Sequence, residues 1–205
     1  YAQLNQAYAL KVMIERCRRR KFKCGGALFW QFNDCWPAIS WSIVDYYLHP
    51  KPAYYAVKRV FQPVLISMVK EGERVEVWIC NDTLKEARGR LYLKGISFTG
   101  RILKEEGKDV SIPANQSIRV LTKSIREMGI ESTREDFIYT FLKMEEGGIE
   151  NHLFLERERY LRFPPREFEK RIYPVEGGLE VELYSSVFVR AIALEVPGEK
   201  AELSD

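Results

Sequence analysis

The stretch GGALFWQFNDCWP, residues 25–37, decides how the opening part of this chain is interpreted. The run at residues 27–32 is short and, apart from Gln31, apolar. It lies between a glycine pair and a turn. Because the run does not alternate between apolar and polar side chains, it favours a strand covered on both faces, as in a parallel sheet. We therefore expect a buried strand at residues 27–32 that ends on Asn33 and Asp34.

Helical patterns lie on both sides of this expected strand. In residues 2–20 the apolar side chains fall on one broad helical face, and Gln, Lys, Glu and Arg fill the other. Pro50-Lys51-Pro52 is a helix-entry signal, and the apolar residues of 53–62 recur at helical spacing. Helix, strand, long loop and helix form a fragment of an α/β layer, which we assign to residues 1–62.

The period changes to two after about residue 63. VEVWICNDT, RGRLYLKGISF, SIRVLT and FIYTFL alternate, with turn residues between them and no helix. Short alternating strands at regular spacing indicate an antiparallel sandwich of immunoglobulin type, here residues 63–162. A linker with adjacent prolines, residues 160–167, precedes the alternating run LEVELYSSVFVRAIALEV. Two strands are expected in that run, as the start of a second, truncated sandwich at 163–205.

The bulk composition narrows the classes of partner. The chain has 205 residues and a net charge of +3, from 32 basic and 29 acidic residues. This balance does not indicate a nucleic-acid or membrane-surface partner. The one basic cluster, residues 16–21, is expected to be the solvated end of the first helix, where cations suit the helix dipole.

The four cysteines form no CxxC pair, and the two histidines stand far apart in the sequence. Zinc-ligand spacing is therefore absent, and we expect no metal and no cofactor. Unlinked thiols favour a reducing compartment, so the expected location is cytoplasmic.

The side chains at the end of the expected strand are the candidate site. In a closed parallel barrel the C-terminal end of each strand opens on the active-site face, which would place Trp30, Asn33, Asp34 and Trp36 at a pocket. Indole rings offer flat apolar faces to sugar rings, and amide or carboxylate groups bind hydroxyls. The same aromatic residues would also suit an ordinary core, and periodicity alone does not separate the two interpretations.

A spaced pattern around this stretch resembles the end of the catalytic barrel of β-mannosidases in glycoside hydrolase family 2. The pattern Trp-Gln-x-Asn-Asp-x-Trp-Pro-x-x-Ser-Trp-Ser-x-x-Asp-Tyr is met by Trp30, Gln31, Asn33, Asp34, Trp36, Pro37, Ser40, Trp41, Ser42, Asp45 and Tyr46. The segments VEVWICNDT, VSIPANQS and AELSD look like the immunoglobulin-like domains that follow the barrel in that family. The resemblance is strongest in residues 24–67 and weaker after about 125.

The resemblance implies a fold and an activity. The fold class would be mixed and mostly β: the C-terminal fragment of a TIM (β/α)8 barrel followed by immunoglobulin-like sandwiches. The activity would be that of a retaining exo-glycosidase that hydrolyses terminal β-D-mannosyl residues, with a β-mannoside or another oligosaccharide as its partner. Trp30 would form an aromatic floor for the sugar, and Asn33 and Asp34 would hold hydroxyls or neighbouring loops. A structural role ranks higher for Trp36 and Trp41.

The resemblance also places the catalytic pair outside this chain. Retaining glycosidases need two carboxyl groups roughly 5 Å apart, which in the family are glutamates on the fourth and seventh barrel strands. The chain begins on a tyrosine at about the seventh helix, so we expect an excised piece with both glutamates upstream. One strand offers no second carboxylate at the required separation, so neither Asp34 nor Asp45 is expected to replace them. We expect the fragment itself to be inactive and to self-associate through its exposed barrel part.

Two other interpretations stay open. Related family 2 exo-glucosaminidases and β-galactosidases share the barrel end, so the resemblance defines the type of reaction and leaves these other sugars as alternatives. A non-catalytic carbohydrate-binding or interaction module built on the sandwiches belongs to another class. The expected strand and helices disfavour it, because a free-standing sandwich has no use for them.

Overall fold

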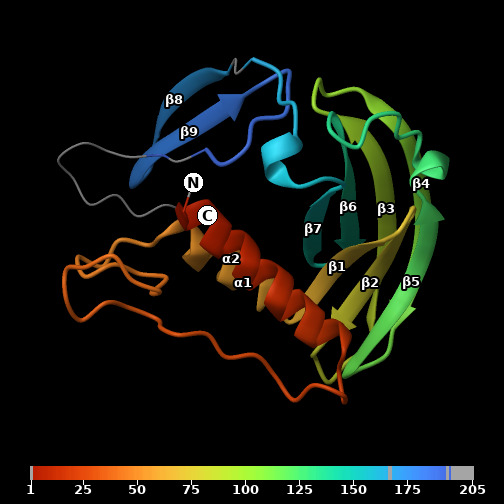
Figure 1. Cartoon of the computed structure of the whole chain (residues 1–205), viewed down its shortest axis with the longest axis horizontal. Helices are drawn as coiled ribbons and strands as arrows, with labels where there is room; N and C mark the ends of the chain where they lie inside the picture. Colours follow the sequence, from red (N-terminus) through yellow and green to blue (C-terminus); the bar gives the residue numbers. More distant parts are fainter. Residues whose placement is uncertain (1, 166–167, 193, 195–205) are drawn as a thin grey trace.

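The computed structural model describes residues 2–165, 168–192 and 194. It has a helical layer at the N-terminal end, an antiparallel β-sandwich, and a two-stranded hairpin near the C-terminal end (Figure 1). The described part of the chain is mostly β-structure. None of its helices is long and apolar enough to cross a membrane.

Two helices form the N-terminal layer, as the sequence predicts. α1 spans Ala2–Arg19, and α2 spans Pro52–Val60 with its proline at the first turn, where the missing backbone N–H costs nothing. The helices pack against each other and against the outer face of the sandwich. Their shared core consists of Ile14, Ile43, Val44, Ala53, Val57, Val60, Leu65 and Cys80.

The segment at residues 27–32 differs from the expected buried strand. It is extended but forms no strand, and its backbone meets a partner only at its end, in a single bridge between Asn33 and Val44. Its side chains nevertheless alternate: Ala27 and Phe29 pack on the helical core, whereas Leu28, Trp30 and Phe32 are exposed. A strand needs backbone partners along its length, and the described residues supply them only at residues 43 and 44.

The sandwich consists of two antiparallel sheets, which confirms this part of the prediction. One sheet has the strand order β1-β2-β5 and the other β4-β3-β6-β7. Within the described residues the strands are β1 Val64–Glu71, β2 Arg74–Asn81, β3 Ala87–Ser97, β4 Ile102–Ile112, β5 Gln116–Ser124, β6 Asp136–Met144 and β7 Gly147–Phe154.

Alternating side chains fill the space between the two sheets. In β3, for example, Leu91 and Leu93 are buried and Tyr92 between them is less so, as expected for a strand with one face in the core. The two sheets also meet where β1 contacts β7. The inter-sheet core includes Ile66, Met68, Val75, Val77, Ile79, Leu91, Leu93, Ile112, Met128, Ile138 and Leu142.

The C-terminal hairpin begins earlier than the sequence pattern predicts. β8 spans Glu169–Val175 and β9 spans Gly178–Tyr184, and the two pair in an antiparallel hairpin. Residues 185–192, expected to belong to a strand, form none, and the last residues of that run lie outside the described part. Phe188 instead packs on Phe98 and Phe137 of the sandwich, so this segment is used for aromatic packing.

Candidate functional site

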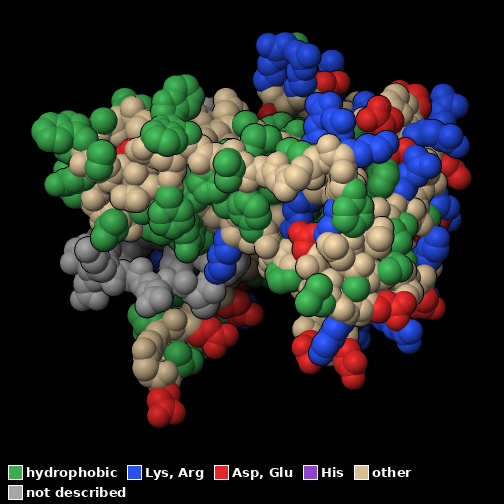
Figure 2. All heavy atoms as spheres, turned by 90° about the horizontal axis from the view of Figure 1, so that it is seen from below, with side chains coloured by type: hydrophobic (Ala, Val, Ile, Leu, Met, Phe, Trp, Pro, Cys, Tyr) green, Lys and Arg blue, Asp and Glu red, His purple; other side chains and the backbone are tan. Residues whose placement is uncertain are grey.

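The candidate site is the segment that carries Trp30 and the loop that follows it. The outward face of the segment holds Leu28 (96% exposed), Trp30 (77%) and Phe32 (57%). The peptide bond between Trp30 and Gln31 is cis. Hydrophobic side chains gather over this end of the molecule (Figure 2). Those of the following loop are Trp36, Ile39, Trp41, Tyr46, Tyr47 and Leu48.

The loop folds around the carboxylate of Asp34. This side chain is buried, and it accepts hydrogen bonds from the Ser40 hydroxyl and, at 2.7 Å, from the Ser42 hydroxyl. Lys51 Nζ lies 3.3 Å from Asp34 Oδ2 and donates a 2.7 Å hydrogen bond to Ser42 Oγ. The start of α2, the serine pair and the end of the extended segment therefore meet at one carboxylate.

These contacts favour the ionised form of Asp34. Hydrogen bonds from Ser40 and then from Ser42 lower its pKa to about 2, with a further contribution from Lys51, although burial opposes the shift. A carboxylate held by two hydroxyls and an ammonium has few lone pairs left for a ligand. The geometry therefore suits a residue that shapes the loop.

Backbone hydrogen bonds hold the two arms of the loop together. Ile43 N donates to Gln31 O at 3.2 Å and to Phe32 O at 3.1 Å, and Val44 N donates to Phe32 O at 2.9 Å. From α1, Gln6 Nε2 donates to the backbone oxygens of Trp41 (2.6 Å) and Ser42 (3.1 Å). Hydrogen bonds therefore connect this loop, called the aromatic loop below because of its exposed tryptophans and tyrosines, both to α1 and across its own two arms.

The structure separates the four expected site residues into two groups. Trp30, Asn33 and Trp36 are exposed, whereas Asp34 is turned inward. Asn33 Nδ2 lies within hydrogen-bond distance of the Asp34 backbone oxygen, at 3.3 Å. The roles of all four toward a sugar stay predictions, and the exposed three are the ones whose side chains a ligand could reach.

Sequence reasoning did not assign Ser40, Ser42 and Lys51 to the contacts of Asp34. The two serines stand in the motif itself, so their presence was visible. Lys51 was interpreted only as part of a helix-entry signal, and its side chain reaches Asp34 from 17 residues away. A lysine between two prolines at the start of a helix carries no pattern that points to a distant carboxylate.

Asp45, the other acidic residue of the loop, also has hydrogen-bond partners within the loop. Its Oδ1 accepts a 2.8 Å hydrogen bond from the His49 backbone, and its Oδ2 lies 3.3 Å from His49 Nδ1. Asp45 therefore closes a turn within the loop. Neither it nor Asp34 presents a carboxylate of the kind that a retaining pair requires.

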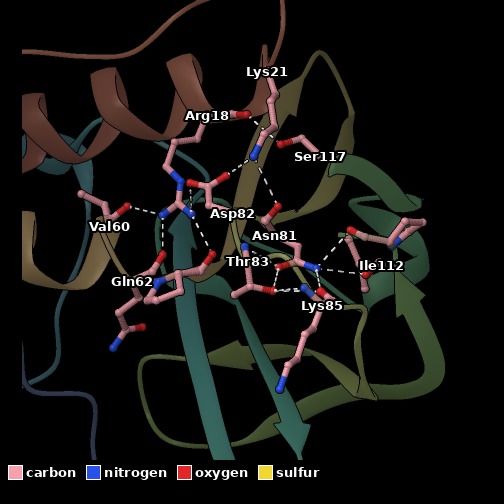
Figure 3. Close-up of polar contacts among 12 residues, drawn as sticks. Arg18, Lys21, Val60, Gln62, Asn81, Asp82, Thr83, Lys85, Ile112 and Ser117 are labelled. Atoms are coloured by element: carbon pink, nitrogen blue, oxygen red, sulfur yellow. Dashed lines mark hydrogen bonds and ion pairs between the residues drawn. The ribbon is translucent and has the colours of Figure 1, made fainter. Parts of the chain in front are cut away.

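The basic cluster at the end of α1 is only partly the solvated helix end that the sequence suggests. Arg16 and Arg20 are exposed, but Arg18 reaches across to the α2–β1 connection (Figure 3). Its guanidinium donates to the backbone oxygens of Val60 (2.6 Å) and Gln62 (2.7 Å). It also pairs with Asp82, at 2.8 Å from Nη2 to Oδ2. A planar five-donor group can satisfy several acceptors at once, so Arg18 joins helix, connection and sandwich.

Asn81, beside this contact, is sealed inside the sandwich although it begins an Asn-x-Thr sequon. It has no exposed surface, and its Nδ2 lies within hydrogen-bond distance of the backbone oxygens of Lys85, Ile112 and Pro113 (Figure 3). Its Oδ1 accepts from the Thr83 backbone and hydroxyl. The side chain braces a turn, and a glycan on it would not fit the folded sandwich.

A second polar joint centres on Glu15, which is 2% exposed. Its carboxylate accepts hydrogen bonds from Ser67 of β1 (2.7 Å) and Asn151 of β7 (2.9 Å). Lys11 Nζ pairs with it at 2.7 Å, and Arg19 Nη1 lies 3.7 Å from Glu15 Oε2. Buried charges persist in proteins when partners neutralise and hydrogen-bond them. This joint fixes α1, and with it the loop that Gln6 holds, on the edge where the two sheets meet.

The class of protein follows from the sandwich. Residues 73–160 match the family model described as a mannosidase Ig/CBM-like domain. The matched stretch runs from the start of β2 past the end of β7. It therefore covers most of the sandwich and lies downstream of the aromatic loop.

The curated relatives that the chain matches are β-mannosidases. β-Mannosidase B of Aspergillus terreus is 41% identical over 118 residues, which cover 50% of this chain and 14% of the relative. β-Mannosidase B of Aspergillus niger is 38% identical over 125 residues, covering 53% and 15%. The chain thus spans about a seventh of the length of these curated relatives.

Solved structures agree with the sequence relatives. The β-D-mannosidase of Dictyoglomus thermophilum superposes with a TM-score of 0.78 at 32% identity, covering 88% of this chain and 23% of that one. The exo-chitosanase CsxA of Amycolatopsis orientalis reaches a TM-score of 0.66 at 16% identity, covering 91% and 26%, which shows a shared fold. The resemblance found in the sequence is confirmed: in sequence and in structure the chain is similar to a partial, C-terminal region of family 2 β-mannosidases.

Proposed function

We propose that this chain supplies one wall of the sugar-binding site of a retaining exo-β-mannosidase. The observation that carries the proposal is the alternation in residues 27–32. One face packs on α1 and α2, and the opposite face presents Trp30 to solvent at the start of an aromatic loop. The β-mannosidases that the chain resembles, in sequence and in structure, support this assignment.

The alternating side chains of residues 27–32 fit the last strand position of a (β/α)8 barrel. In such a barrel each strand turns one set of side chains toward the surrounding helices and the other toward the barrel interior. Ala27 and Phe29 would be the helix-facing set, and Leu28, Trp30 and Phe32 the interior set. We assign residues 1–62 to the end of the barrel, 63–162 to the first sandwich and 163–205 to the start of a second one.

Within this site the exposed residues would contact the sugar. The Trp30 ring would form an apolar floor under a sugar ring, and the Asn33 amide would bind a hydroxyl. Trp36 would border the same pocket. Asp34 would act through the loop, because its carboxylate is already bound by Ser40, Ser42 and Lys51.

The acid/base and the nucleophile would come from residues outside this chain. A retaining mechanism needs two carboxyl groups about 5 Å apart that flank the glycosidic bond. Asp34 and Asp45 are each engaged within the loop. This chain would therefore position the sugar, and the catalytic glutamates would be supplied by the preceding part of the barrel.

The test compares the purified chain with the full-length enzyme to which we assign it. Both are assayed for release of p-nitrophenol from aryl β-D-mannoside, β-D-glucosaminide and β-D-galactoside. We expect no turnover by the chain alone, and the highest kcat/KM of the full-length enzyme on the mannoside.

The two parts of the proposal fail in different ways. Turnover by the purified chain, retained after rigorous removal of contaminating enzymes, would contradict a catalytic pair outside it. A full-length enzyme that prefers the glucosaminide or the galactoside would overturn the sugar assignment and leave the reaction type in place.

A further inference from the structure

Two of the four cysteines meet at the C-terminal end of α1. Cys17 lies in the last turns of the helix, and the chain then turns back so that Cys24 N donates to Arg20 O at 2.9 Å. A backbone bridge between Lys21 and Cys24 closes the turn. The two thiols hydrogen-bond to each other and line the same cavity of ≈ 330 Å³.

The surroundings make the two thiols chemically different. Hydrogen bonding to the Gly26 backbone and to Cys17, followed by the charge of Arg20, lowers the pKa of Cys24. Burial and the hydrogen bond with Cys24 raise the pKa of Cys17. The thiolate is the nucleophile in thiol chemistry, so Cys24 is the thiol that would react first and Cys17 the one that follows.

The other two cysteines provide a contrast within the same chain. Cys35 is exposed on the aromatic loop, and Cys80 is buried in the helical core, whereas Cys17 and Cys24 are partly accessible. Disulfide formation requires two sulfur atoms in contact and access for an oxidant. Among the four cysteines, Cys17 and Cys24 meet both conditions.

We propose that Cys17 and Cys24 are a reversible thiol-oxidation site that forms a disulfide with a small-molecule disulfide, such as oxidised glutathione, as the oxidant. In the first step the Cys24 thiolate attacks one sulfur of the oxidant, and one glutathione thiolate leaves. Cys17 then loses its proton and attacks the Cys24 sulfur, and the second glutathione thiolate leaves. The protein loses two electrons and two protons, and the oxidant is reduced to two thiols.

The position of this disulfide would tie two functional segments together. Cys17 adjoins Arg18, which holds the α2–β1 connection and the sandwich. Cys24 precedes the Gly25–Gly26 pair, from which the chain runs to Trp30. Oxidation would fix the root of the extended segment to the end of α1 and leave the aromatic loop itself unmodified.

The experiment incubates the reduced 205-residue chain in glutathione redox buffers, traps free thiols with an alkylating agent, and maps the products by mass spectrometry. Basic residues lie between Cys17 and Cys24, so trypsin places them on separate peptides. Cys24 and Cys35 share one tryptic peptide, so chymotrypsin is added to cut at the aromatic residues between them. We expect the linked Cys17–Cys24 peptide pair as the main oxidised product, at least about tenfold above any disulfide that includes Cys35 or Cys80. Reduction with dithiothreitol should restore both thiols.

Two matched variants separate the steps. Cys17→Ser should stop at a mixed disulfide of glutathione on Cys24, and Cys24→Ser should leave Cys17 largely unreacted. Circular dichroism checks that both variants fold, which we expect because neither side chain is fully buried. Mixed disulfide on Cys24 of the unaltered chain without the linked pair, or equal reaction at Cys35, would overturn the proposal.

Discussion

The carboxylate of Asp34 is turned into its own loop, where two serine hydroxyls and the Lys51 ammonium bind it. Its neighbour Asn33 stays exposed. Two adjacent polar residues at the end of one extended segment thus have different environments. The difference shows in their side-chain contacts and not in the sequence pattern. At the scale of residues, the candidate site divides into exposed groups that can meet a ligand and an internal group that sets the shape of the loop.

The pKa of Asp34 leads to a prediction about acid. Because its pKa in the folded chain is about 2, below the ordinary 3.8, the unfolded chain takes up the proton first as the pH falls. The stabilising contribution of this carboxylate is therefore complete above about pH 4 and is lost between about 4 and about 2. Carbon-13 NMR titration of the Asp34 carboxyl should give a midpoint well below 3.8. A midpoint at or above the ordinary value would contradict the network around Asp34.

At the scale of elements, local periodicity was enough to predict α1, α2 and several strands of the sandwich. It was not enough for β4, which is a sheet edge rich in Lys and Glu and mostly exposed. Charged edge strands resist unwanted pairing, and the same charges hide their alternation. β8 was hidden for a related reason, since it is exposed and contains Pro174.

The site was predictable as a motif and not as a set of contacts. The spaced pattern around Trp30 identified the loop, and the helical and strand periods identified what surrounds it. Glu15 carried no such signal, because its partners Ser67 and Asn151 are 52 and 136 residues away in the sequence. Contacts of that kind depend on how the elements pack, which periodicity does not describe.

Glu15 is the element-scale test of how α1 is fixed on the sandwich. Glu15→Ala would leave Lys11, Arg19 and Asn151 without their shared acceptor at a buried position. We expect the free energy of unfolding to fall by about 3 kcal/mol in urea titration. Arg16→Ala on the exposed face of the same helix is the matched control, with an expected change within about 0.5 kcal/mol. Equal effects of the two substitutions would show that the joint does not hold the helix.

At the scale of the whole molecule, one end exposes an unusual amount of apolar surface (Figure 2). Exposed apolar patches of this kind mark interfaces in soluble proteins. We predict that the purified chain self-associates through this end as its concentration rises, which light scattering after size-exclusion chromatography would detect. Replacing the exposed Leu28 and Ile39 by Asp should shift the chain toward the monomer. A monomer at all concentrations, with or without these changes, would contradict the prediction.

The most direct test of the account is the effect of Trp30→Ala on β-mannoside hydrolysis by the full-length enzyme. We predict that kcat/KM falls roughly thirtyfold, which corresponds to about 2 kcal/mol of lost stabilisation by the indole ring. Thermal unfolding should change little, because we place the Trp30 ring at the open sugar site at the end of the barrel and not in a packed core. Trp78→Ala is the matched control: this indole lies on the sandwich beside Glu76 and Arg119, and its loss should leave kcat/KM unchanged. Unchanged kinetics for Trp30→Ala, or an equal loss for both variants, would contradict the assignment of this chain to the wall of the sugar site.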